Sequence, residues 1–352
     1  MVPLSLLLQP LRLRGVTLRN RVVMSPMCQY SAGSDGVATD WHLAHYGSRA
    51  ALGVGLVILE ATAVEPRGRI SEQDLGLYHP QQLPALRRLV DFIHAQGAAA
   101  GIQLAHAGRK AFSPQRGRGP QRPVAPSPLP HDEGWQVPEE LDEAGIRAVQ
   151  QAFVQAASWA AELGFDVVEI HSAHGYLLHE FLSPVSNRRQ DRYGGTLAGR
   201  MRMVLEVVEG VRGVWPEERP LFVRISTTDW LEGGFDVEQA VEVARALKER
   251  GVDVIDCSSG GFAGARIPEF PGYQVANARR IRQEVGIATT ALGLISSPEH
   301  AESLLQRGDA DLVVLGRELL RNPGWVLAAA RQLGDPAPWP RQYLRARQRL
   351  DP

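Results

Sequence analysis

Two histidines and a tyrosine lie close together in the segment His171–Tyr176, whose sequence is HSAHGY. An imidazole N–H can donate a hydrogen bond to an electron-rich oxygen, and a phenol can deliver a proton to an atom beside it. A lone buried histidine or tyrosine more often only satisfies its own polar atoms. The three groups His171, His174 and Tyr176 together favour a catalytic site where negative charge develops on a substrate oxygen.

The residues before this segment, 165–170, form a short apolar and β-branched run that is typical of a buried strand. His171, His174 and Tyr176 therefore lie where a strand gives way to a loop. In a parallel α/β protein this position is the carboxyl end of the strand, where active sites collect.

The rest of the chain alternates between strand-like and helix-like segments. The predicted strands are 22–25, 56–60, 99–104, 167–171, 221–225, 252–256, 288–292 and 312–315. Amphipathic helices are predicted at 41–52, 82–96, 142–163, 197–214, 237–247, 274–285, 298–306 and 323–333. Eight such pairs predict an α/β fold, the (β/α)8 TIM barrel. An open doubly wound sheet is the alternative, but it usually carries a glycine-rich loop after its first strand, where this chain has Ser25–Tyr30.

Three further segments complete this prediction. Residues 11–21 alternate in polarity on both sides of Gly15, which predicts an N-terminal β-hairpin that caps the bottom of the barrel. Residues 110–140 are rich in proline, glycine and arginine and form a long loop insertion after the third strand, which we expect to cover the site. Residues 336–352 form a C-terminal tail. We expect one domain over residues 1–352.

The composition excludes several other classes of protein. The 38 lysines and arginines against 39 acidic residues leave a formal charge of −1, so nothing indicates nucleic-acid binding. The two cysteines, Cys28 and Cys257, are too few for a disulfide framework or a four-cysteine metal or iron–sulfur site. No apolar stretch approaches the length of a membrane span, and no signal-peptide pattern is present. We expect a cytoplasmic protein.

In a barrel the residues at the strand ends converge on one site. Besides the histidines and Tyr176, they are Ser25, Pro26, Met27, Cys28, Tyr30, Ala61, Gln103, Arg224, Gly293, Gly316 and Arg317.

These residues provide what an FMN molecule needs. Barrels often bind phosphate after strands seven and eight. Gly293 and Gly316 allow the backbone to approach such a phosphate closely, and Arg317 can bind it through paired hydrogen bonds. Gln103 can read the polar edge of the flavin's pyrimidine ring, and Arg224 can neutralise the negative charge of a reduced flavin. Each feature alone is common in proteins without a flavin, but the combination favours FMN.

From about residue 20 onward the chain resembles the old yellow enzyme family of FMN-dependent ene-reductases, most closely its bacterial, thermophilic-like branch. The matching motifs are RVVMSPMCQY at 21–30, LEATAV at 59–64, GIQLAHAGR at 101–109, HSAHGYLLHEFLSP at 171–184, RRQDRYGG at 188–195, FVRIS at 222–226 and GRELLRNP at 316–323.

This resemblance implies non-covalent FMN and NADPH as the hydride donor that reduces it. The implied flavin contacts are Ser25, Pro26, Met27, Cys28, Ala61, Gln103, Arg224, Gly316 and Arg317. An activated alkene (an enone, maleimide or nitroalkene) would take hydride from flavin N5. His171 and His174 would hold its oxygen, and Tyr176 would protonate the α carbon.

The resemblance also implies further roles. Cys28 would adjust the flavin potential, Tyr30 would be a further substrate contact, and Lys110 in the lid is a weaker candidate. Cys257 is expected to be only a small buried hydrophobe. A homodimer or homotetramer is implied, in which Arg345 reaches into the neighbouring subunit's active site.

Other functions stay open at this point. A metal-dependent barrel hydrolase could use His171, His174, His179 and Glu180, but such enzymes usually carry a His-x-His pair after the first strand, which this chain lacks. His179 is expected in a helical turn that faces away from the site. A non-enzymatic protein that binds a phosphate ligand would need no proton donor at Tyr176. Within the family, reduction of nitro compounds or xenobiotics is the alternative main role.

Overall fold

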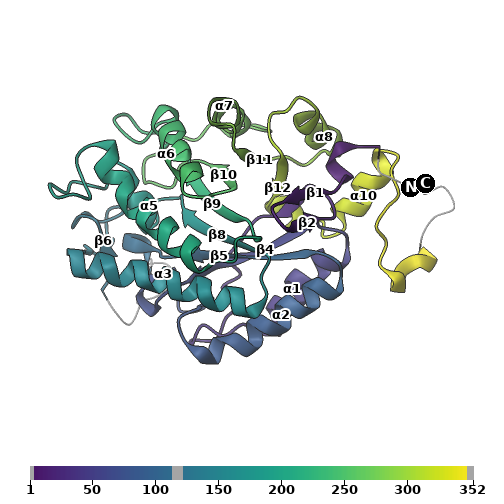
Figure 1. Cartoon of the computed structure of the whole chain (residues 1–352), viewed down its shortest axis with the longest axis horizontal. Helices are drawn as coiled ribbons and strands as arrows, with labels where there is room; N and C mark the ends of the chain where they lie inside the picture. The colour runs from purple at the N-terminus through teal and green to yellow at the C-terminus, as the bar shows by residue number, and fades with distance from the viewer. Residues whose placement is uncertain (1–3, 113–121, 347–352) are drawn as a thin grey trace.

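The structure, a computed structural model, describes residues 4–112 and 122–346. Eight parallel strands close into a barrel (Figure 1), so the predicted TIM barrel is confirmed and the doubly wound alternative is wrong. In chain order the barrel strands are β3 (Val22–Met24), β4 (Leu56–Ala63), β5 (Ala99–Ala105), β8 (Val167–Ser172), β9 (Leu221–Ser226), β10 (Val254–Ser258), β11 (Ala288–Ala291) and β12 (Leu312–Leu315). The sixth strand begins and ends two residues later than predicted.

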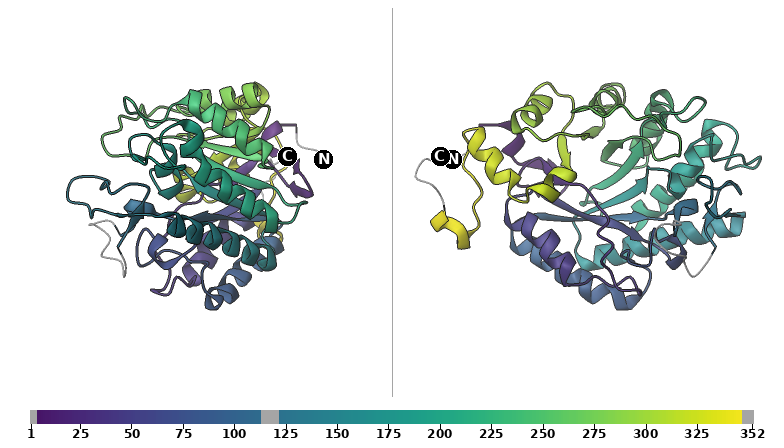
Figure 2. Two further views of the ribbon diagram at one scale, coloured as in Figure 1. Left: turned by 60° about the vertical axis from the view of Figure 1, so that its left-hand side comes forward. Right: turned by 180° about the vertical axis from the view of Figure 1, so that it is seen from behind.

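The predicted helices are all present around the barrel (Figures 1 and 2). They are α1 (Asp40–Ala51), α2 (Leu83–Ala95), α3 (Glu143–Leu163), α5 (Leu197–Val214), α6 (Val237–Glu249), α7 (Val275–Val285), α8 (Pro298–Gln306) and α10 (Trp325–Gln332). Asp236 caps α6 by accepting a hydrogen bond from the backbone of Gln239. Two short helices, α4 (Leu177–Leu182) and α9 (Arg317–Arg321), follow β8 and β12 directly. None of the described helices is long and apolar enough to cross a bilayer.

The hairpin predicted near the N-terminus is confirmed. Strands β1 (Leu11–Leu13) and β2 (Val16–Leu18) pair antiparallel. Leu18 is fully buried against residues at the starts of the barrel strands, among them Val23, Leu56 and Val167. The hairpin therefore closes the amino end of the barrel and leaves the carboxyl end for the site.

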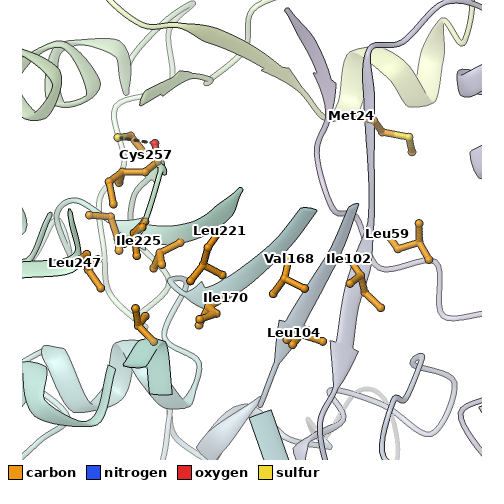
Figure 3. Close-up of a cluster of buried hydrophobic side chains, with 14 of the residues drawn as sticks. Met24, Leu59, Ile102, Leu104, Val168, Ile170, Leu221, Ile225, Leu247 and Cys257 are labelled. Carbon is orange, nitrogen blue, oxygen red and sulfur yellow. Dashed lines mark hydrogen bonds between the residues drawn. The ribbon is translucent and has the colours of Figure 1, made fainter. Parts of the chain in front are cut away.

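Side chains along each strand alternate between the helices and the barrel interior. Val168 and Ile170 of β8 point outward into the apolar layer shared with the helices, as does Cys257 of β10 (Figure 3). Cys257 is fully buried there, as expected for a small hydrophobe. The alternate residues of β8, Glu169 and His171, therefore face the interior.

The long insertion and the tail lie on opposite sides of the molecule. The described part of the insertion contains the paired two-residue strands β6 (Val124–Ala125) and β7 (Glu139–Glu140), and residues 113–121 of the expected lid lie outside the described residues. β6 contacts α4 and the 3-10 turn η4 (Gly108–Lys110), which follow β8 and β5. The tail ends in the turn η5 (Arg341–Ala346), on the side away from β6 (Figures 1 and 2). Residues 347–352 lie outside the described residues.

Further single 3-10 turns complete the described elements: η1 (Leu6–Leu8), η2 (Pro66–Gly68) and η3 (Pro80–Gln82).

Candidate active site

A cavity of about 350 Å³ lies at the carboxyl ends of the barrel strands. The residues expected from the strand ends line it, with one exception: Ser25, Pro26, Met27, Cys28, Ala61, Gln103, His171, His174, Tyr176, Arg224, Gly293, Gly316 and Arg317. The exception is Tyr30, which is absent from the lining and has a left-handed backbone conformation with φ of 51°. Arg345 is exposed, lies in η5 and does not line this cavity.

A bulge in β4 decides which of its residues enters the cavity. Leu59 pairs with Ile102 and Ala61 with Gln103, so Glu60 is an extra residue in the ladder. Glu60 instead accepts hydrogen bonds from Tyr46 of α1 at 2.5 Å and from the backbone of Gln29 at 3.0 Å. Without the bulge, strand alternation would turn the Glu60 carboxyl inward where a small residue now lies.

The two histidines and Tyr176 form one compact group. The His171 ring lies 5.1 Å from the centroids of both the His174 and the Tyr176 rings and meets them edge to face. Nδ1 of His171 accepts a hydrogen bond from the backbone of Ala173 at 3.2 Å, which leaves Nε2 as the protonated nitrogen. Nε2 of His174 lies 2.7 Å from the hydroxyl of Ser258, which leaves Nδ1 as its remaining nitrogen.

Both imidazoles are neutral at physiological pH. Burial lowers the pKa of His171 and of His174 well below the ordinary value, and the nearby Arg224 guanidinium lowers both further. A neutral imidazole still donates an N–H to a substrate oxygen and adds no charge to the site. The pair can therefore polarise a carbonyl or nitro oxygen without first having to lose a proton.

The loops after β8 and β10 touch each other backbone to backbone beside this group. His174 has a left-handed φ of 60°, and a Cβ added at Gly261 would overlap the His174 backbone. Nζ of Lys110 donates hydrogen bonds to the carbonyls of His174 at 2.8 Å and Gly261 at 3.1 Å, and lies 4.8 Å from the centroid of the Tyr176 ring. Lys110, a weak candidate by sequence, is thus held next to the expected proton donor.

His179 and Glu180, the other possible metal ligands of a barrel hydrolase, do not lie in this group. Nε2 of His179 pairs with Asp229 at 2.9 Å, and its Nδ1 accepts from the backbone of Gly175. Oε1 of Glu180 accepts from the backbone of Arg109 at 2.9 Å. Neither His179 nor Glu180 lines the cavity, and the described residues contain no cluster arranged to hold a metal ion.

The comparison with known families agrees with this geometry. The model of the NADH:flavin oxidoreductase / NADH oxidase family matches residues 6–335. The chain belongs to this family.

Relatives place the chain more narrowly within the flavin oxidoreductases. An NADPH dehydrogenase of Listeria monocytogenes serotype 4a is 52% identical over 344 residues, which cover 97% of this chain and 99% of the relative. The structure of morphinone reductase superimposes on this one with a TM-score of 0.80 at 31% identity. The superposition covers 95% of this chain and 91% of morphinone reductase. An old yellow enzyme homologue from Zymomonas mobilis has a TM-score of 0.77 at 27% identity, covering 90% of both chains. The resemblance to old yellow enzymes is confirmed.

Membership of the NADH:flavin oxidoreductase family implies a flavin and a nicotinamide cofactor. The cavity fits a flavin with a phosphate. A Cβ added at Gly316 would point toward Met27 and Ser25, so the glycine leaves that part of the cavity open. Arg317, at the first turn of α9, forms no ion pair within the described residues. Arg224 donates to the Ser25 hydroxyl at 3.1 Å, at the cavity floor.

Several lining residues were missed by sequence reasoning. They are Ile70, Ser258, Ser259, Tyr273, Gln274, Leu292, Leu294, Ile295, Val314, Glu318 and Arg321. Ser258 ends β10, so the strand-end rule would have found it had strand six been ended correctly. Tyr273 comes from the long connection between β10 and α7, for which the sequence pattern offers no comparable signal.

Proposed function

We propose that this flavin oxidoreductase is an NADPH dehydrogenase of the old yellow enzyme type that reduces the C=C bond of activated alkenes. The observation that carries the proposal is the position of the His171 ring in the cavity, 5.1 Å from the ring centroids of both His174 and Tyr176. The 52% identity to the Listeria NADPH dehydrogenase supports NADPH as the hydride donor.

FMN is the proposed cofactor, bound without a covalent bond in one domain spanning the chain. The proposed contacts are Ser25, Pro26, Met27, Cys28, Ala61, Gln103, Arg224, Gly293, Gly316 and Arg317. When bound, it supplies hydride chemistry, accepting a hydride from NADPH and delivering one to the alkene.

The residues of the chain bind, polarise and protonate the substrate. The neutral His171 and His174 donate hydrogen bonds to the carbonyl or nitro oxygen and stabilise the charge that develops on it. Tyr176, beside them, donates its proton to the α carbon. Tyr30 is proposed as a further substrate contact. Cys28 lines the cavity and is proposed to adjust the flavin potential.

Enones, maleimides and nitroalkenes are the proposed substrate class. Reduction of nitro compounds or other xenobiotics is the second candidate for the main role, because the same pair of N–H donors also fits a nitro group. The similarity to morphinone reductase, a protein named for reducing a ketone, supports a carbonyl compound as the substrate.

We also propose a homodimer or homotetramer. Arg345 is exposed in η5, which lies on the side of the subunit away from β6 (Figures 1 and 2), and it does not line the cavity of its own subunit. An arginine in this position can complete the site of a neighbouring subunit with a planar, permanently charged group.

The test has two parts. Acid precipitation of the purified protein should release about one FMN per chain, as one phosphate site per barrel implies. Tyr176→Phe removes only the proton donor, so reduction of the flavin by NADPH should continue while alkene reduction slows about 10²-fold or more. Tyr78→Phe, outside the cavity, is the matched control. Metal without flavin, or equal slowing of both half-reactions in Tyr176→Phe, would contradict the proposal.

A further inference from the structure

Two buried carboxyl groups lie close to Arg224, a residue of the candidate flavin site, on adjacent strands. Glu169 of β8, Arg224 of β9 and Asp256 of β10 face the barrel interior, because each lies two residues after a member of the apolar cluster inside the barrel. The exposed fractions are 0% for Glu169, 7% for Arg224 and 0% for Asp256. Arg224 lines the cavity, and the two carboxyl groups are buried next to it without lining the cavity themselves.

The hydrogen bonds of this group leave one oxygen on each carboxyl without another partner. Oε1 of Glu169 accepts from the Gln103 side-chain amide at 2.8 Å. Oδ1 of Asp256 accepts from the Thr290 hydroxyl, and Oδ2 lies 3.4 Å from Nε of Arg224. Apart from the contact between the two carboxyl groups, Oε2 of Glu169 and Oδ2 of Asp256 make no other hydrogen bond within the described residues.

One proton shared between the two carboxyl groups would provide these two oxygens with a hydrogen bond and remove one negative charge. Two buried carboxylates beside a single guanidinium would carry a net negative charge in a low-dielectric interior, which is strongly unfavourable. Burial first, and then the negative charge of Asp256, raise the pKa of Glu169 to about 8, while Arg224 acts in the opposite direction. Asp256 and Arg224 are the ionisable groups that act on Glu169; β5 presents only the neutral Gln103 amide.

We propose that Glu169 is a charge-balancing and positioning residue for the flavin: it shares one proton with Asp256, and it fixes the Gln103 amide. The shared proton leaves the guanidinium of Arg224 balanced by one negative charge instead of two. Because the Gln103 amide nitrogen donates to Glu169, its oxygen remains free to accept a hydrogen bond from the flavin ring. The inference rests on the proposed function, since it requires that FMN binds in this cavity.

The proposal predicts how many protons accompany reduction of the bound cofactor. Transfer of a hydride adds two electrons and one proton, so one negative charge appears near the Glu169–Asp256 pair. Below about pH 8 the pair already holds its proton and takes up nothing further. Above this pH the pair has lost its proton in the oxidised protein, and the new charge makes it bind one proton from solvent.

The experiment is a titration of the midpoint potential of bound FMN against pH in the holoenzyme. With one proton per two electrons the potential falls by about 30 mV per pH unit, the value of a tenfold change for a two-electron couple. In the wild type we expect this slope below about pH 8 and about twice this slope above it. Glu169→Gln, which keeps an acceptor for Gln103, should show the single lower slope throughout.

Two further variants keep the test decisive. Glu180→Gln is the matched control, because burial raises the pKa of Glu180 also to about 8 but its side chain interacts with Arg109 and not with Gln103 or Arg224; it should keep the change of slope. Asp256→Asn removes the negative neighbour, so the change of slope should move to lower pH. This second variant also serves if Glu169→Gln does not fold.

A wild type with one slope throughout, or a Glu169→Gln variant that keeps the change of slope, would overturn the inference. Failure of the proposed function looks different, because the purified wild type would then contain no FMN and no potential could be measured.

Discussion

Nζ of Lys110 lies 4.8 Å from the centroid of the Tyr176 ring and is held there by the backbone carbonyls of His174 and Gly261. A cation in this position stabilises the phenolate that remains after Tyr176 has given up its proton. Lys110→Met should therefore slow alkene reduction by about tenfold and leave reduction of the flavin by NADPH unchanged. Stopped-flow measurement of the two half-reactions separates these effects, with Lys248→Met on α6 as the control.

The charge of Lys110 also gives alkene reduction a pH dependence. Burial lowers the pKa of Lys110 to about 8, so the ammonium is present below this pH and is lost as the pH rises through it. The rate of alkene reduction should therefore fall above about pH 8 in the wild type and show no such fall in Lys110→Met. If the variant keeps both the wild-type rate and the wild-type profile, the lysine has no part in proton transfer.

Replacing both histidines should weaken the binding of phenols, which mimic a substrate oxygen that carries negative charge. The double variant His171→Ala/His174→Ala loses two hydrogen bonds to that oxygen, and we expect the dissociation constant to rise about 10- to 100-fold. The measurement is a titration of the flavin absorbance with a para-substituted phenol. His94→Ala, a partly exposed histidine of α2, is the control. Unchanged affinity in the double variant would show that the pair does not hold this oxygen.

The proposed exchange of Arg345 between subunits can be tested by complementation. Tyr176→Phe and Arg345→Ala should each be impaired, and mixing them under conditions that exchange subunits should restore activity above either parent. A mixed dimer then contains one site with both Tyr176 and a partner's arginine. No recovery despite proven exchange would mean that Arg345 acts in its own subunit or has no role.

Asp229 is expected to be important for stability. Its carboxylate pairs with His179 at 2.9 Å and accepts hydrogen bonds from the Ser183 hydroxyl at 2.6 Å and the Phe235 backbone at 2.7 Å, with both His179 and Asp229 fully buried. Asp229→Ala leaves these buried groups without their partner, so the free energy of unfolding should fall by about 3–5 kcal/mol. Arg147→Ala breaks only an exposed pair with Glu143 and should cost less than about 1 kcal/mol. Denaturant unfolding of both variants, saturated with FMN, provides the comparison.

The sequence was sufficient to predict the barrel because hydrophobic periodicity and strand endings are local properties of the chain. It also placed His171, Gln103 and Arg224 at the cavity, because in a barrel the strand ends must converge. Alternation alone would have turned Glu60 inward, and only the bulge, a feature of pairing between β4 and β5, explains why Ala61 lies there.

The partners of buried polar groups could not be predicted from local sequence patterns, because these partners lie far apart in the sequence. In the sequence Glu169 is a single polar residue in an apolar strand. Its protonation depends on Asp256, which the fold brings next to it from two strands away. Tyr273 enters the cavity from a long connection whose course depends on the tertiary structure. The contact of Lys110 with Tyr176 likewise requires two loops to meet in space.

The close approach of Gly261 to His174 has a consequence for engineering this scaffold. The loops of TIM barrels are often regarded as independent modules that can be exchanged one at a time to change selectivity. Here the loops after β8 and β10 share one backbone contact with no room for a side chain and one lysine that bridges them. A library that varies one of these loops alone will mostly sample strained combinations, so the two loops and Lys110 are best recombined as a single cassette.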